Sequence, residues 1–102
     1  LIFDEVDTGI SGSAAQKVGM KLKEVSKSSQ VLCVTHQAQL AALADAHYLI
    51  SKQVEDGRTF TQVKLLDFDG RKHELARIIG GVSITDAALA HAESMLKESE
   101  EL

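Results

Sequence analysis

The sequence lacks proline and tryptophan altogether and is poor in aromatic residues, with one Tyr and three Phe among its 102 residues. These absences exclude Pro-rich linkers and polyproline recognition segments. The single cysteine, Cys33, cannot form an internal disulfide, and it lies within an apolar run. We therefore expect Cys33 to be a small buried hydrophobe in a protein from a reducing compartment.

Long hydrophobic runs and an excess of positive charge are also absent. No apolar run approaches the roughly 18 residues of a membrane helix, and no charged segment with a cleavage site opens the chain. The net charge is -4 and the basic residues are scattered, so composition does not indicate that this piece binds DNA alone. The sequence predicts a cytoplasmic protein without a membrane segment.

Length and hydrophobic content favour one compact domain or a part of one. The chain has 102 residues, of which 44% are hydrophobic, which is enough for a real core and too short for two domains. It begins without Met, and Leu1-Ile2-Phe3 already has the pattern of a core strand buried on both faces. We expect residues 1–102 to be a fragment, the C-terminal part of one head domain.

Apolar spacing and turn signals alternate between strands and helices. The patterns predict, in order, helix 13–26 with a capping box at Ser13, strand 30–35, helix 37–44, strand 47–52, a hairpin turn at Asp56-Gly57, strand 59–66, a turn at Asp69-Gly70, helix 74–79 capped by Gly80, and a last helix from Ser83 or Thr85. Such alternation is typical of a parallel sheet with crossover helices. The fold class is therefore α/β, a mainly parallel sheet with flanking helices and an added β-hairpin.

Unusual polar residues follow the first two strands. Asp4 and Glu5 come directly after the first strand, and His36 follows the second. In an open parallel sheet, ligands bind outside the carboxyl ends of the strands. Because successive side chains point to opposite faces, the two carboxylates suit different tasks, one as a ligand for Mg²⁺ and the other as a base for water. A nearby His could hydrogen-bond a phosphate oxygen.

The sequence does not encode a phosphate-binding loop. No Gly-x-x-x-x-Gly-Lys-[Ser/Thr] motif occurs between Leu1 and Leu102. In a phosphoryl-transfer enzyme, the backbone N–H groups and the Lys of that loop hold the phosphates. Any phosphate cradle must therefore come from outside this chain.

The stretch Leu-Ile-Phe-Asp-Glu-Val-Asp resembles the Walker B segment of ATP-binding-cassette and SMC-type ATPase heads. This resemblance implies ATP and Mg²⁺ as cofactors, with Mg²⁺ on Asp4 and Glu5 as the hydrolytic base. Val34-Thr35-His36 is similar to the switch-histidine motif, which implies a catalytic role for His36. The following segment takes the place of the D-loop, which contacts a second head: Asp7, Thr8, Gly9, Ile10 and Ser11.

Longer matches make the resemblance more specific. Asp-Glu-Val-Asp-Thr-Gly-Ile-Ser-Gly, then Val-Thr-His-Gln-Ala-Gln and Glu-Leu-Ala-Arg-Ile-Ile-Gly-Gly, are similar to the C-terminal end of the RecN family of bacterial SMC-like DNA repair ATPases. The resemblance implies the C-terminal lobe of a P-loop ATPase head, acting in double-strand-break repair and recombination. It implies as partners an N-terminal lobe, a coiled coil, the second head of a homodimer, and DNA through the full-length protein. Ser11 departs from the Asp of most such D-loops.

Other interpretations remain open at this point. The chain could instead be a non-catalytic scaffold lobe of an SMC-like protein. Whether Glu5 and His36 face one common cleft distinguishes this alternative from an ATPase. A phospho-acceptor receiver domain also gathers acidic residues at strand ends, but it needs five βα units and a suitably placed Lys. The spacing of His47, His73 and His91 predicts no metal cluster.

Overall fold

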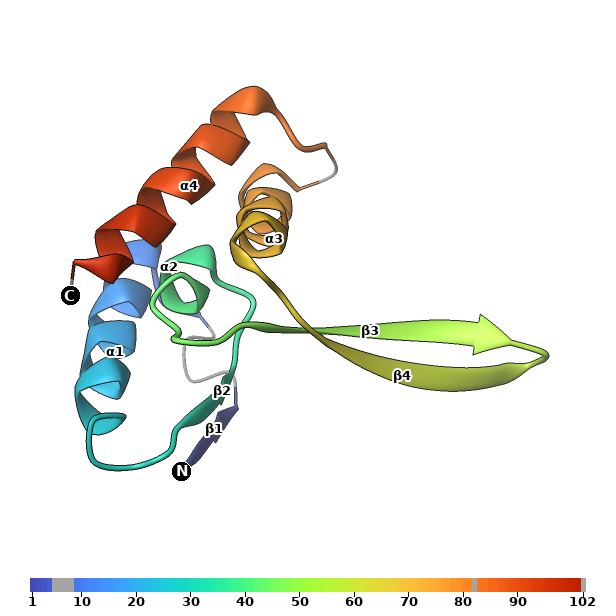
Figure 1. The fold of residues 1–102 in the computed structure, drawn as a ribbon, viewed down its shortest axis with the longest axis horizontal. Helices are drawn as coiled ribbons and strands as arrows, with labels where there is room; N and C mark the ends of the chain where they lie inside the picture. Colours follow the sequence, from blue (N-terminus) through green and yellow to red (C-terminus); the bar gives the residue numbers. More distant parts are fainter. Residues whose placement is uncertain (5–8, 82, 102) are drawn as a thin grey trace.

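In the computed structural model, residues 1–4, 9–81 and 83–101 are described. Figure 1 shows a body of helices with one long hairpin projecting from it. The elements are β1 (Ile2–Asp4), α1 (Gly12–Val25), β2 (Leu32–Val34), α2 (Ala38–Ala41), β3 (Tyr48–Glu55), β4 (Arg58–Leu65), α3 (Phe68–Gly80) and α4 (Asp86–Glu100). Helices and strands alternate as far as β3, so the α/β class is confirmed.

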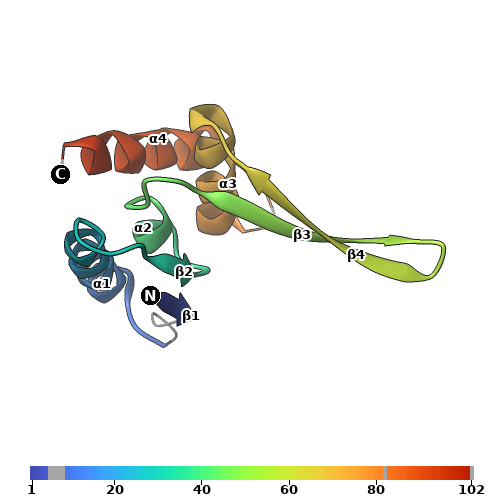
Figure 2. The ribbon, with the colours of Figure 1, turned by 60° about the horizontal axis from the view of Figure 1, so that its bottom comes forward.

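The strands form two separate sheets. β1 pairs with β2 in parallel, with Ile2 opposite Leu32 and Asp4 opposite Val34, whereas β3 pairs antiparallel with β4. Figure 2 shows the hairpin leaving the body away from β1 and β2. Within the described residues, β3 therefore does not join the parallel pair as the alternation predicts.

A tight turn explains why β3 pairs with β4. Asp56 and Gly57 have φ angles of 50° and 75°, the left-handed conformation that a two-residue hairpin turn requires at both positions. The predicted turn is confirmed, and it brings Glu55 directly opposite Arg58. Pairing across such a turn closes a minimal loop, whereas the position of a strand in a larger sheet also depends on neighbours that its own pattern does not specify.

The core lies among the helices. Leu75, Ala76, Ala92 and Leu96 are almost fully buried where α3 packs on α4, and the alanines of α2 complete the cluster. On the other side of α2, a Cβ atom at Gly19 of α1 would lie 2.7 Å from the Cδ1 atom of Leu40. A side chain at this position would therefore have to displace the ends of the Leu40 and Leu43 side chains.

Several helix ends differ from those that the sequence predicts. Ser11 caps α1 in place of Ser13, since its Oγ atom accepts a hydrogen bond from the Ala14 N–H at 3.4 Å. Asp67 caps α3 by accepting from the Gly70 N–H at 2.7 Å, so the predicted turn at Asp69-Gly70 is instead the first helical turn. Both capping residues precede the first apolar position, and a strong cap moves the helix start toward it.

The bounds of the last two helices agree with the prediction in part. The residue that ends α3 with positive φ is Gly81, at 70°, and Gly80 remains helical. The N-cap of α4 is Thr85, which is one of the two predicted candidates. Its Oγ1 atom accepts a hydrogen bond from the Ala88 N–H at 3.0 Å. The acidic residues from Glu98 onward predict a frayed end, but α4 continues to Glu100.

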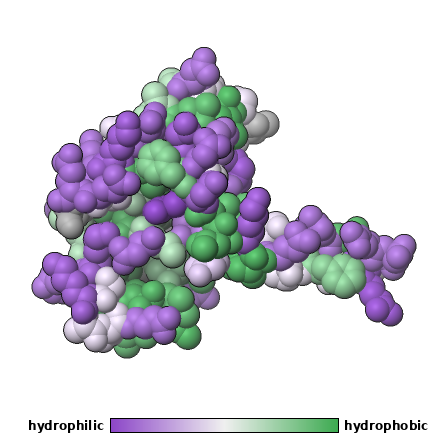
Figure 3. Space-filling model, viewed as in Figure 1, coloured by the Kyte–Doolittle hydropathy of each residue, from purple (hydrophilic) through white to green (hydrophobic). Residues whose placement is uncertain are grey.

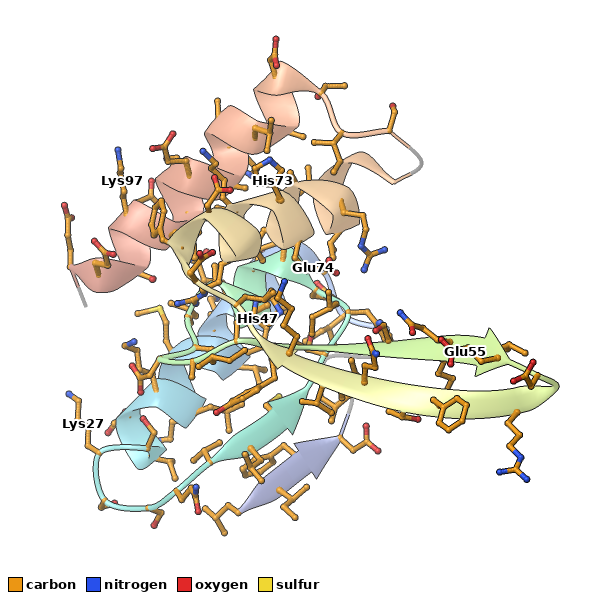
Figure 4. The ribbon with its side chains drawn as sticks, turned by 45° about the vertical axis from the view of Figure 1, so that its right-hand side comes forward. Lys27, His47, Glu55, His73, Glu74 and Lys97 are labelled. Atoms are coloured by element: carbon orange, nitrogen blue, oxygen red, sulfur yellow. The ribbon has the colours of Figure 1, made fainter. Side chains whose placement is uncertain are left out.

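The hairpin meets the body at a junction of basic side chains. The Arg71 Nη2 atom donates to the carbonyl oxygens of Ala41, Ala42 and Ala44 at 3.4, 3.5 and 2.8 Å. These carbonyls lie at the C-terminal end of α2, where the carbonyl oxygens of a helix need partners from outside it. The Ala41 carbonyl also accepts from the Ala44 N–H at 3.2 Å. Figure 4 shows His47 below Glu74, where β3 leaves the body. Arg71 therefore ties α3 to α2 next to the base of the hairpin.

Burial lowers the pKa of His47, and the nearby positive charge of Arg71 lowers it further, while Glu74 acts in the opposite direction. Below the unfolded-state value of 6.5, the unfolded chain binds a proton at this position that the folded chain resists. We expect the melting temperature to fall as the pH falls from 6.5 through the lower pKa of folded His47. His47→Gln should flatten this part of the pH profile, whereas the same change at exposed His91 should leave it unchanged. Equal slopes in the wild type and His47→Gln would contradict this prediction.

Two apolar surfaces are left uncovered in this chain. One face of the hairpin carries exposed apolar side chains: Tyr48, Ile50, Val54, Val63 and Leu65. The β1–β2 pair exposes Leu1, Ile2, Leu32 and Val34. Figure 3 shows the hydrophobic colour gathered at the base of the hairpin and at the lower edge of the body. The expectation that the first strand is buried on both faces is wrong within this chain, because Ile2 is 77% exposed.

Candidate functional site

Asp4 and His36 lie at the same edge of the parallel pair. Asp4 is the last residue of β1 and stands opposite Val34, the last residue of β2. His36 follows Val34 by two residues, and the side chains of Asp4 and His36 are both exposed. The two residues are therefore gathered at the carboxyl ends of adjacent strands, where α/β proteins bind ligands. Glu5, Asp7 and Thr8 lie outside the described residues.

The segment Gly9–Ser11 leads into α1. Gly9 has a φ angle of 80°, which a residue with a side chain rarely adopts, and Ile10 is half-buried. Ser11 then fixes the start of α1, because its carbonyl oxygen accepts from the Ala15 N–H at 2.9 Å while its hydroxyl caps Ala14. The last two residues of the predicted D-loop thus lead directly into the first helical turn.

Gln37 joins this segment to the loop that carries His36. The Gln37 Nε2 atom donates a hydrogen bond to the Ile10 carbonyl oxygen at 3.0 Å, across 27 positions of sequence. The Gln37 backbone N–H donates to the Thr35 Oγ1 atom, also at 3.0 Å, which folds the chain tightly around His36. One side chain therefore connects the residue after the predicted switch histidine to the predicted D-loop.

The packing of α1 against α2 supports the segments at the carboxyl ends of β1 and β2. Besides the close approach at Gly19, the Lys23 Nζ atom donates to the Leu43 carbonyl oxygen at 3.1 Å and lies 3.3 Å from Asp45. The start of α1 is close to α2 as well, because a Cβ atom at Gly12 would lie 2.8 Å from the Gln39 Nε2 atom. The two helices fix the relative position of the segments that precede them.

One hollow in the described part of the chain lies elsewhere. It has a volume of about 470 Å³ and lies among α1, α2 and α4. Its lining includes Met20 and Met95, with His91 and Glu98, but none of the predicted site residues. This hollow therefore lies apart from the strand ends that carry Asp4 and His36.

A metal ligand set is not complete within the described residues. Among them, no three His, Cys, Asp or Glu side chains lie close enough together to hold a metal ion. Asp4 offers exposed carboxylate oxygens, a donor type that suits Mg²⁺. Mg²⁺ commonly takes only one or two protein carboxylates and completes its shell with water and phosphate oxygens. The donor chemistry of Asp4 therefore fits a nucleotide-bound Mg²⁺.

Sequence reasoning did not assign a role to Gln37. Gln37 is the N-cap residue of α2, a position where Ser, Thr, Asp or Asn is preferred. The unusual residue at this position is the sequence feature that could have pointed to it. A residue that breaks a local preference often does so for a function elsewhere. The junction of Arg71 and His47 was also missed, since neither residue belongs to a recognisable pattern. The described helices include none long and apolar enough to span a membrane.

The chain is similar to known DNA repair proteins over its whole length. It is 48% identical over 102 residues to DNA repair protein RecN of Bacillus subtilis and 47% identical over 102 residues to that of Xylella fastidiosa. It is 50% identical over 96 residues, or 94% of the chain, to RecN of Deinococcus radiodurans. The chain spans only about 17–18% of these relatives. No family model matches it.

A solved structure supports the same comparison. The match has a TM-score of 0.62 and 26% identity, and it covers 78% of this chain and 47% of the other. That structure comes from work described as structural biochemistry of ATP-driven dimerization and DNA stimulated activation of SMC ATPases. The fold of this chain is therefore similar to part of an SMC ATPase.

Proposed function

We propose, from the premise that this chain resembles the C-terminal 17–18% of RecN along its whole length, that it is the C-terminal portion of an ATPase head in a DNA repair protein. In this proposal the chain supplies the Walker B carboxylates, the D-loop and the switch histidine for ATP hydrolysis. The remainder of the head, a coiled coil and the phosphate-binding loop belong to the rest of the full-length protein, which acts in double-strand-break repair in the bacterial cytosol.

The single observation that carries the proposal is that Asp4 ends β1 and His36 follows the end of β2 by two residues, at the same edge of the parallel pair, in a chain 46–50% identical to RecN relatives. An ATPase head needs a carboxylate and an imidazole at such an edge, because it must hold Mg²⁺ and contact the γ-phosphate at the same place. The similarity to RecN makes this reason specific.

Each residue has a distinct task in the proposed site. Asp4 binds the Mg²⁺ that accompanies ATP, directly or through a water molecule. Glu5 accepts a proton from the attacking water, and His36 donates a hydrogen bond to the γ-phosphate or orients that water. The segment from Asp7 to Ser11 faces the second head of a homodimer. In this proposal the full-length protein binds DNA, and this chain by itself does not.

The Mg²⁺ requirement tests the proposed role of Asp4. In the full-length protein, Asp4→Asn should lower both Mg²⁺-dependent ATP affinity and turnover, because a neutral amide oxygen is a poorer ligand for a hard cation. Asp56→Asn makes the same chemical change at the hairpin turn, where the φ angle of 50° suits Asn as well as Asp, and should leave both quantities unchanged. Nucleotide binding titrated at several Mg²⁺ concentrations measures the effect. The same Mg²⁺ dependence in Asp4→Asn and in the wild type would contradict the assignment.

A further inference from the structure

We propose that Gln37 is a positioning residue that couples the D-loop segment Gly9–Ser11 to the loop carrying His36, so that the two move as one unit. The inference rests on the proposed ATPase function and adds to it a residue with no assigned role. Its direct basis is the hydrogen bond from the Gln37 Nε2 atom to the Ile10 carbonyl oxygen, at 3.0 Å.

Gln37 is held so that its side chain reaches Ile10. Its backbone N–H is bound to the Thr35 hydroxyl, and its carbonyl oxygen accepts from the Ala41 N–H at 3.0 Å. The backbone of Gln37 is thus fixed on both sides, by the β2 loop and by α2. The amide side chain is directed away from the cap position of α2, although capping is what a residue here usually does.

The other end of the bond is equally well fixed. Ile10 is half-buried, and the next residue, Ser11, makes both its capping bonds into the first turn of α1. A shift of the Gly9–Ser11 segment would therefore either break the bond to Gln37 or move Gln37 with it. Because His36 directly precedes Gln37 in the chain, its position depends on the same bond.

The coupling matters for the proposed reaction because the D-loop meets the partner head while His36 meets the γ-phosphate. A bond between them would place His36 correctly only when the partner head has docked on the segment at residues 9–11. Small errors in the placement of a catalytic group can lower rates by roughly 100-fold even when binding is unaffected. The inference predicts a loss in turnover rather than in nucleotide affinity.

Three variants of the full-length protein test this. Gln37→Glu keeps the size of the side chain but replaces the N–H donor with an acceptor, and Gln37→Ser removes the reach to Ile10 while supplying a preferred helix cap. We expect both to lower kcat by roughly 10- to 100-fold with KM for ATP within about 2-fold of the wild type. Gln37→His keeps a neutral N–H donor of similar reach and should retain most of the turnover.

Melting temperature separates positioning from a structural role. If Gln37 only stabilised the fold, Gln37→Ser would keep wild-type kcat or would lose kcat and melting temperature together, and either result would overturn the inference. A lowered kcat in Gln37→Ser at an unchanged or higher melting temperature supports it. Gln53→Glu, an exposed residue of the hairpin, is the matched control for the amide-to-carboxylate change and should behave as the wild type.

A Glu5→Gln variant assayed in parallel distinguishes this inference from the proposed function. If Glu5→Gln abolishes turnover while Gln37→Glu and Gln37→Ser retain it, the ATPase proposal stands and the coupling role of Gln37 is wrong. If Glu5→Gln itself retains turnover, only the catalytic role of Glu5 is wrong. If the wild-type full-length protein shows no ATP turnover, the proposed function is wrong, and the coupling has no reaction to serve.

Discussion

Glu5→Gln in the full-length protein should lower ATP turnover by roughly 10²- to 10⁴-fold, the usual contribution of a general base, while ATP binding persists. The amide has nearly the size and shape of the carboxylate, so the nucleotide site should keep its form. It cannot accept the proton of the attacking water. ATP-bound head dimers should therefore accumulate, and size-exclusion chromatography with Mg·ATP would detect them as a larger species.

The hairpin offers a matched control for this variant. Glu55 lies opposite Arg58 next to the hairpin turn, and its side chain is exposed. Figure 4 shows it far from the carboxyl ends of β1 and β2. Glu55→Gln makes the same chemical change and should leave turnover and dimer formation at wild-type levels. Near-normal turnover in Glu5→Gln would remove this residue from catalysis.

The strand ends were predictable because the chemistry there is local. A run of three apolar residues followed by Asp4 specifies both a strand and the edge where it ends, and Thr35-His36 does the same for the second strand. Once two such strands are parallel, their carboxyl ends meet at one edge without further information. The register of Asp4 opposite Val34 bears out that step.

The position of β3 and the contact of Gln37 were not predictable in the same way. The pattern of residues 47–52 indicates a strand but not which strand it pairs with, and the turn at Asp56-Gly57 decided in favour of β4. The bond from Gln37 to Ile10 depends on how α1 packs against α2 at Gly19. Such packing depends on contacts distant in sequence, so no local pattern shows it. The helix starts differ from the prediction for a more local reason. Ser11 caps α1 in place of Ser13, and the cap at Asp67 begins α3 before the predicted turn at Asp69-Gly70.

The exposed apolar faces bear on how the isolated chain should behave. The hairpin face that carries Ile50 and Val63 and the open β1–β2 pair both present apolar side chains and unpaired strand edges to solvent. Unprotected strand edges and large apolar patches favour association with other chains. We expect the isolated chain to self-associate in proportion to its concentration, and the rest of the full-length protein to suppress this by covering the same faces.

The 102-residue chain alone should neither hydrolyse ATP nor bind it tightly, even when folded. Phosphoryl transfer requires the β- and γ-phosphates to be held by backbone N–H groups and a Lys, and the chain encodes no such loop. Asp4 by itself would hold Mg²⁺ only weakly, because Mg²⁺ loses its waters reluctantly and takes part of its shell from the phosphates. Calorimetry with Mg·ATP should therefore detect no binding tighter than about 1 mM, a free energy of only about 4 kcal/mol. Activity should appear when the chain is mixed with the separately expressed remainder of the protein, and mixing with a remainder whose phosphate-loop Lys is changed to Ala should give none. Micromolar ATP binding by the chain alone would show that the nucleotide site is not divided between the two pieces.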